Sequence, residues 1–437
     1  MKRKRELLAL GIVLSYGLSS CSSSEGTDMM DSEPKVLVNM VADPQPIQLT
    51  NEQRVFASEN NHFTLNFLKT VNDAEKRGKS FIYSPLSMTY VLGMVNDAAT
   101  GKTEQELEQT LGFHEGGIKA VNEYCKKLID GLPKVDTNVQ LNIANAIFLN
   151  KRYTLQQQFQ EDMQTYYDAK AEALDFSSSQ TLDHINGWCN DMTKGMIPKI
   201  LDEVKPEMAS YLLNAIYFKA DWTSKFDQKN TKTETFTTES GKTKLPMMHQ
   251  NVIIYYAKNG VYSSVGITYG NGEWNMIVML PEDGKTTDDI ISHLASNGLT
   301  MYGFCGTMGD VFTPHEVDLK LPRFETASDT DELDMKDGLV GVLKLMGINL
   351  AFDSNLAEIP NMCDTPLYID MMRQKAQIKV NEEGSEAAAV TVAGMNVTSV
   401  GPRDYPHAIF HANRPFVYVI REASSGVILF VGKYTGA

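Results

Sequence analysis

The sequence predicts an α+β fold in one large domain, and three observations lead to that prediction. Helix signals dominate the first half of the chain, and alternating strand-like segments dominate the second half. Helices followed by strands are the order of an α+β protein. No linker divides the body of the 437 residues, so a single domain over residues 50–437 is expected.

The elements follow from capping signals and from hydrophobic periodicity. Thr50 with Gln53 predicts a capping box that opens a helix, and Thr103 with Glu106 predicts another. Ser84 before Pro85 is a third helix start, because proline is favoured at the first helical position. The apolar face of the first helix is Val55, Phe56, Phe63, Phe67, Leu68 and Val71. Strands are predicted over residues 139–149, 211–218, 275–280, 317–323, 376–380, 416–421 and 427–433, with a hairpin turn at 270–272.

Composition and charge exclude several classes of function. With 42% apolar and 22% charged residues, the chain is typical of a soluble globular protein. The net charge of −15 argues against nucleic acid as a partner, because a phosphate backbone needs a basic surface. No Lys/Arg run follows the first five residues, so no polyanion cofactor is expected.

Catalytic and metal-binding motifs are missing from the sequence. The cysteines Cys21, Cys125, Cys189, Cys305 and Cys363 show no CxxC spacing and no nearby histidine pair, so no metal site is predicted. Buried free thiols are expected, and a disulfide is the alternative in an oxidising compartment. No nucleophile elbow, zinc-protease motif or P-loop occurs. We therefore expect neither an enzyme nor a cofactor.

The N-terminus predicts export and lipidation. Basic residues 2–5 precede an uncharged run over residues 7–18, which is the pattern of a signal peptide. The sequence Leu18-Ser-Ser-Cys21 resembles the bacterial lipobox, so residues 1–20 would be removed and Cys21 acylated. Residues 21–49 have the composition of a flexible tether. The expected location is the cell envelope, lipid-anchored at the outer membrane or cell surface. An ordinary signal peptide with a chance cysteine is the alternative.

Residues 382–393 carry the strongest functional signal. Every second residue from Ser385, namely Ser385, Ala387, Ala389, Thr391 and Ala393, is small and uncharged, and these side chains share one face of an extended strand. A permanent core strand normally carries larger apolar residues, and a permanent loop carries more turn formers. The segment could therefore lie as a loop or enter a sheet as an extra strand. An alanine-rich helix is the alternative by composition.

Several motifs together resemble the serpin family, of the inhibitory type. Residues 382–389 are similar to the hinge of the reactive-centre loop of that family. The other similar segments, in family order, are 81–87, 185–188 with 193–195, 214–222, 319–324, 410–420 and 426–432. The resemblance implies helices packed around a large central mixed β-sheet with smaller sheets, and an exposed mobile loop at about residues 384–405. It also implies a monomeric suicide-substrate inhibitor of serine proteases, with cysteine proteases as a second class.

The resemblance also assigns roles to individual residues. The hinge would be Glu382, Glu383, Gly384, Ser385, Glu386, Ala387, Ala388 and Ala389. Ser84, Ser87 and Asn214 match the polar cluster through which the sheet opens, and Gln374 stands where the family often has histidine, which argues against pH-sensitive opening. Trp222 matches the aromatic residue beneath the point where the loop first inserts.

The bait bond is placed by the usual family distance from Gly384. That distance predicts cleavage between Thr398 and Ser399, in a small and apolar stretch that suits elastase-like proteases first, then subtilisin-like or chymotrypsin-like ones. Because the stretch from Ser399 to Pro415 is longer than in most serpins, cleavage between Arg403 and Asp404 by a trypsin-like protease is the alternative. A non-inhibitory surface protein that binds a ligand or host material is the alternative function.

Lipidation at Cys21 can be tested directly. We expect a bacterial host to incorporate labelled fatty acid into the full-length protein and Cys21→Ala to abolish the label, since only that thiol would be acylated. Cys125→Ala is the matched control and should stay labelled. Labelling that survives the loss of Cys21 would contradict the lipobox interpretation.

Overall fold

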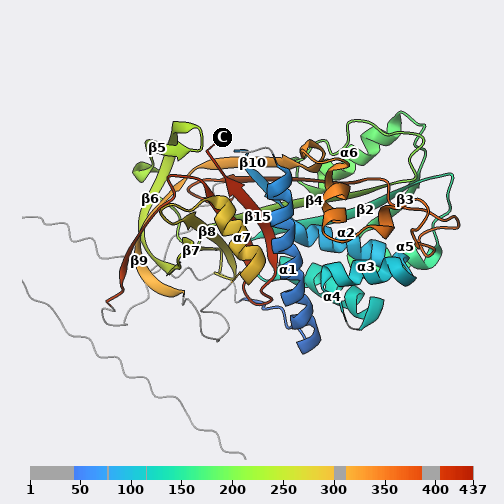
Figure 1. The fold of residues 1–437 in the computed structure, drawn as a ribbon, viewed down its shortest axis with the longest axis horizontal. Helices are drawn as coiled ribbons and strands as arrows, with labels where there is room; N and C mark the ends of the chain where they lie inside the picture. The colour runs from blue at the N-terminus through green and yellow to red at the C-terminus, as the bar shows by residue number, and fades with distance from the viewer. Residues whose placement is uncertain (1–43, 76–77, 115, 300–311, 386–403, 437) are drawn as a thin grey trace, which may run out of the picture. The chain divides into compact units, whose positions relative to one another are not determined.

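In the computed structural model, three of the described α-helices begin at a residue whose side chain caps a backbone N–H group. The structure describes residues 44–75, 78–114, 116–299, 312–385 and 404–436 (Figure 1). Within these ranges the helices are α1 (Asn51–Ala74), α2 (Pro85–Ala98), α3 (Gly101–Leu111), α4 (Gly117–Gly131), α5 (Gln157–Tyr167), α6 (Gln180–Met192), α7 (Thr287–Asn297) and α8 (Gly338–Leu345). No described helix combines the length and the apolar character that crossing a membrane requires.

Two of the three predicted helix starts are confirmed. Thr50 and Gln53 exchange both bonds of a capping box at 3.1 Å, and Ser84 caps α2 with Pro85 at its first position. The start at Thr103 is wrong, because α3 begins at Gly101 after Thr100. Thr103 Oγ1 instead accepts the N–H of Glu358 at 3.0 Å. A tertiary contact has taken the hydroxyl that local sequence assigned to a cap.

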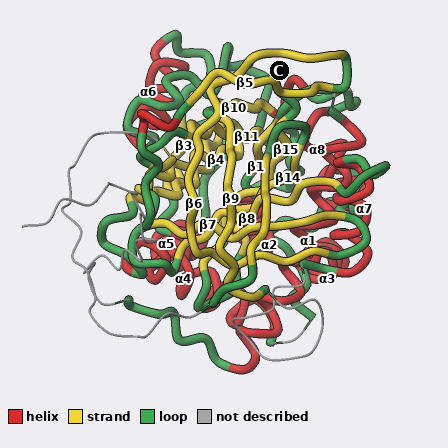
Figure 2. Tube along the Cα trace, turned by 90° about the vertical axis from the view of Figure 1, so that its left-hand side faces the viewer, coloured by secondary structure: helices red, strands yellow, loops and turns green. Residues whose placement is uncertain are grey.

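The strands form two mixed sheets. The six-stranded sheet runs in the order β10 (Phe324–Asp329), β11 (Met372–Val380), β12 (Gly384–Ser385), β4 (Ser210–Asp221), β2 (Gln140–Asn150) and β3 (Lys170–Leu174). The nine-stranded sheet runs in the order β1 (Phe81–Tyr83), β15 (Ile428–Tyr434), β14 (Phe416–Glu422), β8 (Trp274–Pro281), β7 (Tyr262–Tyr269), β6 (Gly241–Lys258), β9 (Thr313–Pro322) and β13 (His407–His411), with β5 (Lys232–Thr238) beside β6. Figure 2 shows the long strands β6 and β9 running side by side.

Strand β4 of the six-stranded sheet is buried on both faces along most of its length, and its sequence shows it. Along β4, Leu212, Ile216 and Phe218 belong to the main core, whereas the alternate residues Leu213 and Ala215 belong to a smaller core under α6. This period of two explains the nearly continuous apolar run, because a strand covered on both sides needs no polar face. In Figure 1, α6 lies on the opposite face of this sheet from α2, α3 and α4.

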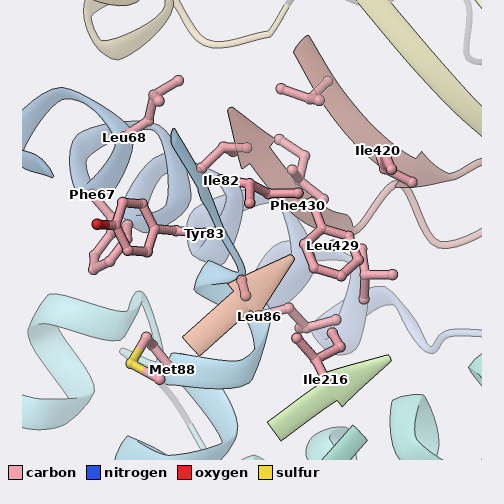
Figure 3. Close-up of a cluster of buried hydrophobic side chains, with 14 of the residues drawn as sticks. Phe67, Leu68, Ile82, Tyr83, Leu86, Met88, Ile216, Ile420, Leu429 and Phe430 are labelled. Atoms are coloured by element: carbon pink, nitrogen blue, oxygen red, sulfur yellow. The ribbon is translucent and has the colours of Figure 1, made fainter. Parts of the chain in front are cut away.

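The main core joins the two sheets to the N-terminal helices. Figure 3 shows side chains of this core, among them Ile216 of β4 and Phe430 of β15, and Phe67 meets Tyr83 edge to face with 6.1 Å between ring centroids. Phe218 of β4 also meets Phe430 edge to face, with 6.1 Å between ring centroids. Burying aromatic and branched side chains from both sheets in one cluster supplies most of the stability of such a fold.

The α+β class and the mixed central sheet are confirmed, with two qualifications. Strands β1 to β4 lie in the first half of the chain, so helices and strands are less segregated than predicted. Val55 is 57% exposed, because it lies on the solvent side of α1 rather than on its apolar face. Cys125, Cys189 and Cys363 are buried free thiols, as expected; Cys21 and Cys305 lie outside the described residues.

Candidate functional site: the hinge and the seam of the six-stranded sheet

The six-stranded sheet contains a seam between β11 and β4. The two strands pair in parallel only from Met372 opposite Leu212 to Lys375 opposite Ala215. Beyond that point, no pairing across the seam is found for residues 376–379 of β11 or 216–219 of β4 within the described strands. The facing edges of these two stretches therefore have no sheet partner among the described residues, and such edges are a template for an added strand.

The short strand β12 lies in the seam at its upper end, beside Val380 of β11 and Ala220 of β4. Ser385 pairs with Val380 of β11 on one side and with Ala220 of β4 on the other, antiparallel to both. Gly384 pairs with Asp221. Residues 384–385 thus begin a strand between β11 and β4, and the stretches 376–379 and 216–219 lie next in the direction in which that strand runs.

Gly384 is required at this position by a close approach of two backbones. A Cβ built on Gly384 would lie 2.0 Å from the carbonyl oxygen of Ala220 and 2.7 Å from the Cα of Asp221. Backbone atoms cannot move aside as the end of a side chain can. Only glycine lets the segment pass this close to β4.

Ser385 is buried and points toward aromatic residues in the main core. Its Oγ lies 2.7 Å from the hydroxyl of Tyr269 at the end of β7, and Ser385 itself has no exposed surface. Tyr269 stacks on Trp222, with 4.2 Å between the ring centroids and 13° between the planes. Trp222 donates from its backbone N–H to the Glu383 carbonyl at 2.7 Å and from Nε1 to the Asn381 carbonyl at 2.8 Å. Trp222 therefore supports the hinge directly.

Two acidic residues anchor the chain just before Gly384. Glu382 has 2% of its side chain exposed and accepts hydrogen bonds from Arg323 Nε at 2.7 Å on both oxygens. Thr231 also donates to Glu382. Burial opposes ionisation of this carboxyl, but the bonds from Arg323 and Thr231 and the Arg323 charge outweigh it and lower its pKa. The more exposed Glu383 pairs with Lys225 at 2.7 Å.

The polar cluster beneath the seam is divided between its two sides. Gln374 of β11 accepts the N–H of Ser84 and donates to the Ser84 carbonyl, each at 2.9 Å. Asn214, opposite Gln374 in register, instead donates to Asn145 of β2 at 2.8 Å. Ser87 lies 3.0 Å from Ser84, between their hydroxyl oxygens. No hydrogen bond joins the described side chains of Gln374 and Asn214, so the seam here depends on backbone pairing.

The connection from α6 to β4 forms a strap across the seam. Lys375 Nζ of β11 donates to the Lys199 carbonyl at 3.0 Å, and Arg373 pairs with Asp202 at 3.4 Å. Asn186 of α6 holds the same strap by accepting the N–H groups of Ile200 and Leu201 at 2.8 and 2.9 Å. These bonds connect β11 to elements on the β4 side, so separation of the strands must disturb them.

The predicted site residues fall into two groups. The structure brings Glu382, Glu383, Gly384 and Ser385 together with Trp222, and it brings Ser84, Ser87 and Gln374 together below the seam, with Asn214 opposite. Glu386, Ala387, Ala388, Ala389, Thr398, Ser399, Arg403 and Cys21 lie outside the described residues. Asp404 is described and exposed, three residues before β13.

Sequence reasoning missed four residues of the site: Tyr269, Arg323, Thr231 and Asn145. They come from β7, from the junction of β9 and β10, from the segment before β5, and from β2. Only Asn145 carried a local signal, as an amide inside a predicted strand whose neighbours are apolar. The described residues contain no group of three or more histidines, cysteines and acidic residues that could hold a metal ion.

Comparisons with known proteins agree with this geometry. The family model described as Serpin (serine protease inhibitor) matches residues 58–436. Serpin B6 of Pongo abelii is 31% identical over 390 residues, which cover 87% of this chain and 99% of the relative. Neuroserpin of Gallus gallus is 30% identical over 373 residues, covering 82% of this chain and 87% of the relative.

Solved structures show the same fold. Serpin48 of the insect Tenebrio molitor superposes with a TM-score of 0.74 at 24% identity, covering 89% of this chain and 100% of the other. Thyroxine-binding globulin in complex with thyroxine superposes with a TM-score of 0.71 at 25% identity, covering 87% and 98%.

The anchoring of Glu382 predicts a pH dependence of known sign. A carboxyl whose pKa is lowered by folding contributes stability above its ordinary pKa of 4.5 and loses it as the pH falls through the lowered value. We expect Glu382→Gln to reduce the free energy of the first unfolding transition in guanidinium by about 1–3 kcal/mol at pH 7. That difference should shrink as the pH falls below 4.5.

The matched control is Glu325→Gln on β10, which removes an exposed carboxylate paired with Lys379. Exposed pairs contribute little, so this variant should differ from wild type by less than about 1 kcal/mol at every pH. A Glu382→Gln difference that stays constant down to acid pH would contradict the assigned anchor.

Proposed function

This chain belongs to the serpin family, and we propose that it is an irreversible suicide-substrate inhibitor of serine proteases. The observation that carries the proposal is the position of Gly384–Ser385, which begins a strand between β11 and β4 at the head of two edges that have no partner among the described residues. The family description as serine protease inhibitor supports the same function.

The proposed mechanism starts with attack by the protease on the bait loop. The catalytic serine of the protease forms an ester with the carbonyl carbon at the bait bond, and the peptide bond breaks to release a new amino terminus. The part of the loop that begins at Gly384 then has a free end. It can extend β12 as a full strand and pair with residues 376–379 on one side and 216–219 on the other. Each new backbone bond contributes about 0.5–1.5 kcal/mol.

The side chains of the loop suit that insertion. Ser385 points into the main core, where it meets Tyr269. Strand side chains alternate with a period of two, so Ala387, Ala389, Thr391 and Ala393 would follow on the same side. All are small and uncharged. A charged residue on that face would be buried without a partner, at a cost of several kcal/mol.

The length of the loop suits displacement of the bound protease. About 15 residues separate Gly384 from the proposed bond, which is roughly 50 Å as a strand. A globule of about 385 residues has a radius of gyration near 21 Å, hence a diameter of roughly 55 Å. Complete insertion would carry the esterified protease across nearly the whole domain. The uninserted state must be held by a kinetic barrier, because the inserted state is the more stable one.

We assign the bait bond to Thr398–Ser399 and the target to elastase-like proteases, with Arg403–Asp404 and a trypsin-like target as the alternative. We further propose that Cys21 is acylated and that the inhibitor is held at the bacterial envelope by that anchor. The apolar run and lipobox-like sequence at residues 7–21 support this location.

A non-inhibitory binding function is the second candidate. One structure with the same fold is thyroxine-binding globulin in complex with thyroxine, so the fold is compatible with ligand binding. Denaturing gel electrophoresis after mixing with elastase-like and trypsin-like proteases separates the two. An inhibitor gives a covalent band that resists denaturant, and a binding protein gives none.

The insertion step can be tested with a charge placed on the inward face. We expect Ala387→Arg to leave the loop cleavable but to convert the inhibitor into a substrate, because a guanidinium cannot be buried unpaired during insertion. The stoichiometry of inhibition should rise by about tenfold or more. Ala388→Arg is the matched control, since that side chain would face the other way and should leave trapping intact. Equal trapping by Ala387→Arg and wild type would refute the inserted-strand mechanism.

The bait bond can be identified from the fragment released on cleavage. Mass spectrometry of the C-terminal fragment from the covalent complex should give a peptide that begins at Ser399. That result would agree with a small or apolar residue on the acyl side of the bond. A fragment that begins at Asp404 would overturn this bond and make the target trypsin-like.

A further inference from the structure

A turn behind the hinge holds the end of β4 in place. The turn joins β7 to β8 through Gly270 and Asn271, directly after Tyr269. The N–H of Gly270 donates to the carbonyl of Asp221 at 2.9 Å, and Thr223 Oγ1 donates to the Gly270 carbonyl at 2.9 Å. The same turn therefore fixes Tyr269, which contacts Ser385, and Asp221, which pairs with Gly384.

A buried carboxylate holds this turn in place. Asp136, 2% exposed, accepts the N–H of Asn271 on Oδ2 at 2.7 Å. The Asn271 side chain donates to the Val135 carbonyl at 3.0 Å and accepts the N–H of Glu273 at 3.1 Å. Gly270 has a φ of +50°, and a Cβ there would lie 2.0 Å from Asp136 Oδ2. The contact leaves no room for another residue at Gly270.

Two of the first described residues, Gln45 and Ile47, form hydrogen bonds with the body of the domain. Gln45 donates its backbone N–H to the Val135 carbonyl at 3.3 Å, which is the carbonyl that Asn271 also uses. Ile47 is 6% exposed and donates from its N–H to Ser424 Oγ at 2.8 Å. Gln45 and Ile47 precede residues 58–436, which match the family model.

We propose that Asn271 and Asp136 are positioning residues that control how readily the seam opens. Their hydrogen bonds among the described residues do not include the hinge residues 382–385. They act through Gly270, which holds Asp221, the partner of Gly384, and through Tyr269, which contacts Ser385. Loosening this turn frees the upper end of β4, so the intact loop can insert without being cleaved. This inference deepens the proposed inhibitory function and rests on it for its consequence.

The test compares two asparagines that cap the turns at opposite ends of β7. Asn271→Ala removes the bond to Val135 and the bond from Glu273 at the hinge end. Asn259→Ala is the matched control, because its side chain accepts the N–H groups of Val261 and Tyr262 at 2.8 and 2.9 Å at the other end. Both variants should lower the unfolding midpoint by similar amounts. Asp136→Asn keeps an oxygen that can accept the Asn271 N–H. Its unfolding midpoint should therefore lie between those of wild type and Asn271→Ala.

Amide hydrogen exchange of the uncleaved proteins measures the positioning itself. We expect the N–H groups of Ala220, Trp222 and Ser385 to exchange about tenfold faster in Asn271→Ala than in wild type or Asn259→Ala. Equal exchange in the two alanine variants would overturn the positioning role. This readout does not depend on whether the protein inhibits a protease.

The consequence for inhibition is measured by storing the uncleaved proteins and following their inhibitory capacity over time. Titration with an elastase-like protease should show that Asn271→Ala loses inhibitory capacity about tenfold faster than Asn259→Ala. The inactive product should be more heat-resistant than the starting protein, since an inserted loop stabilises the sheet. Loss of capacity through unfolded or aggregated protein would overturn the inference.

A control on wild type separates this inference from the proposed function. Wild type nicked in the loop by a protease that it does not trap should become more heat-stable. If nicking leaves wild type no more stable, the inhibitory mechanism fails, and the exchange data still decide the role of Asn271.

Discussion

The structure depends on one constraint, the incomplete pairing of β11 with β4. Four residue pairs, Met372–Leu212 to Lys375–Ala215, close the lower part of the seam, and Ser385 closes its upper end. Between them, no described residue pairs with the facing edges of residues 376–379 and 216–219. Backbone groups in such a place normally find partners. An added strand would pair with both edges, and the proposed inhibitory mechanism would draw on the hydrogen bonds that form there.

The side-chain bonds near the seam are arranged so that its two sides can separate. Gln374 fixes β11 to Ser84 at the start of α2, whereas Asn214 fixes β4 to Asn145 of β2. These bonds lie on the two sides of the seam, so neither needs to break when it opens. The strap bonds of Lys375 and Arg373 do cross it. Opening would then require the strap to shift, while each half of the sheet stays intact.

Much of the hinge could be predicted from residues adjacent in the chain. The alternation of small residues from Ser385 to Ala393 predicted a segment able to join a sheet, and the family resemblance assigned Glu382 to Ser385 to its hinge. The partners of these residues could not be predicted from composition or periodicity. Tyr269 and Arg323 lie 116 and 59 positions from their hinge partners, and no local pattern indicates such a pairing. Thr103 shows the converse, because a capping signal there was overridden by a contact with Glu358.

The sequence by itself determined the elements, their buried faces and the family resemblance, because capping, periodicity and small-residue alternation are local properties that survive without tertiary context. Only the tertiary structure decided where the direct pairing of β11 with β4 ends. Whether an edge of β4 is paired depends on how far β11 runs beside it, and that is set by the packing of Trp222 and Tyr269 against β12 at one end and by the strap at the other. Such a balance between distant contacts has no signature in any single segment, so the seam became visible only once both strands lay in one sheet.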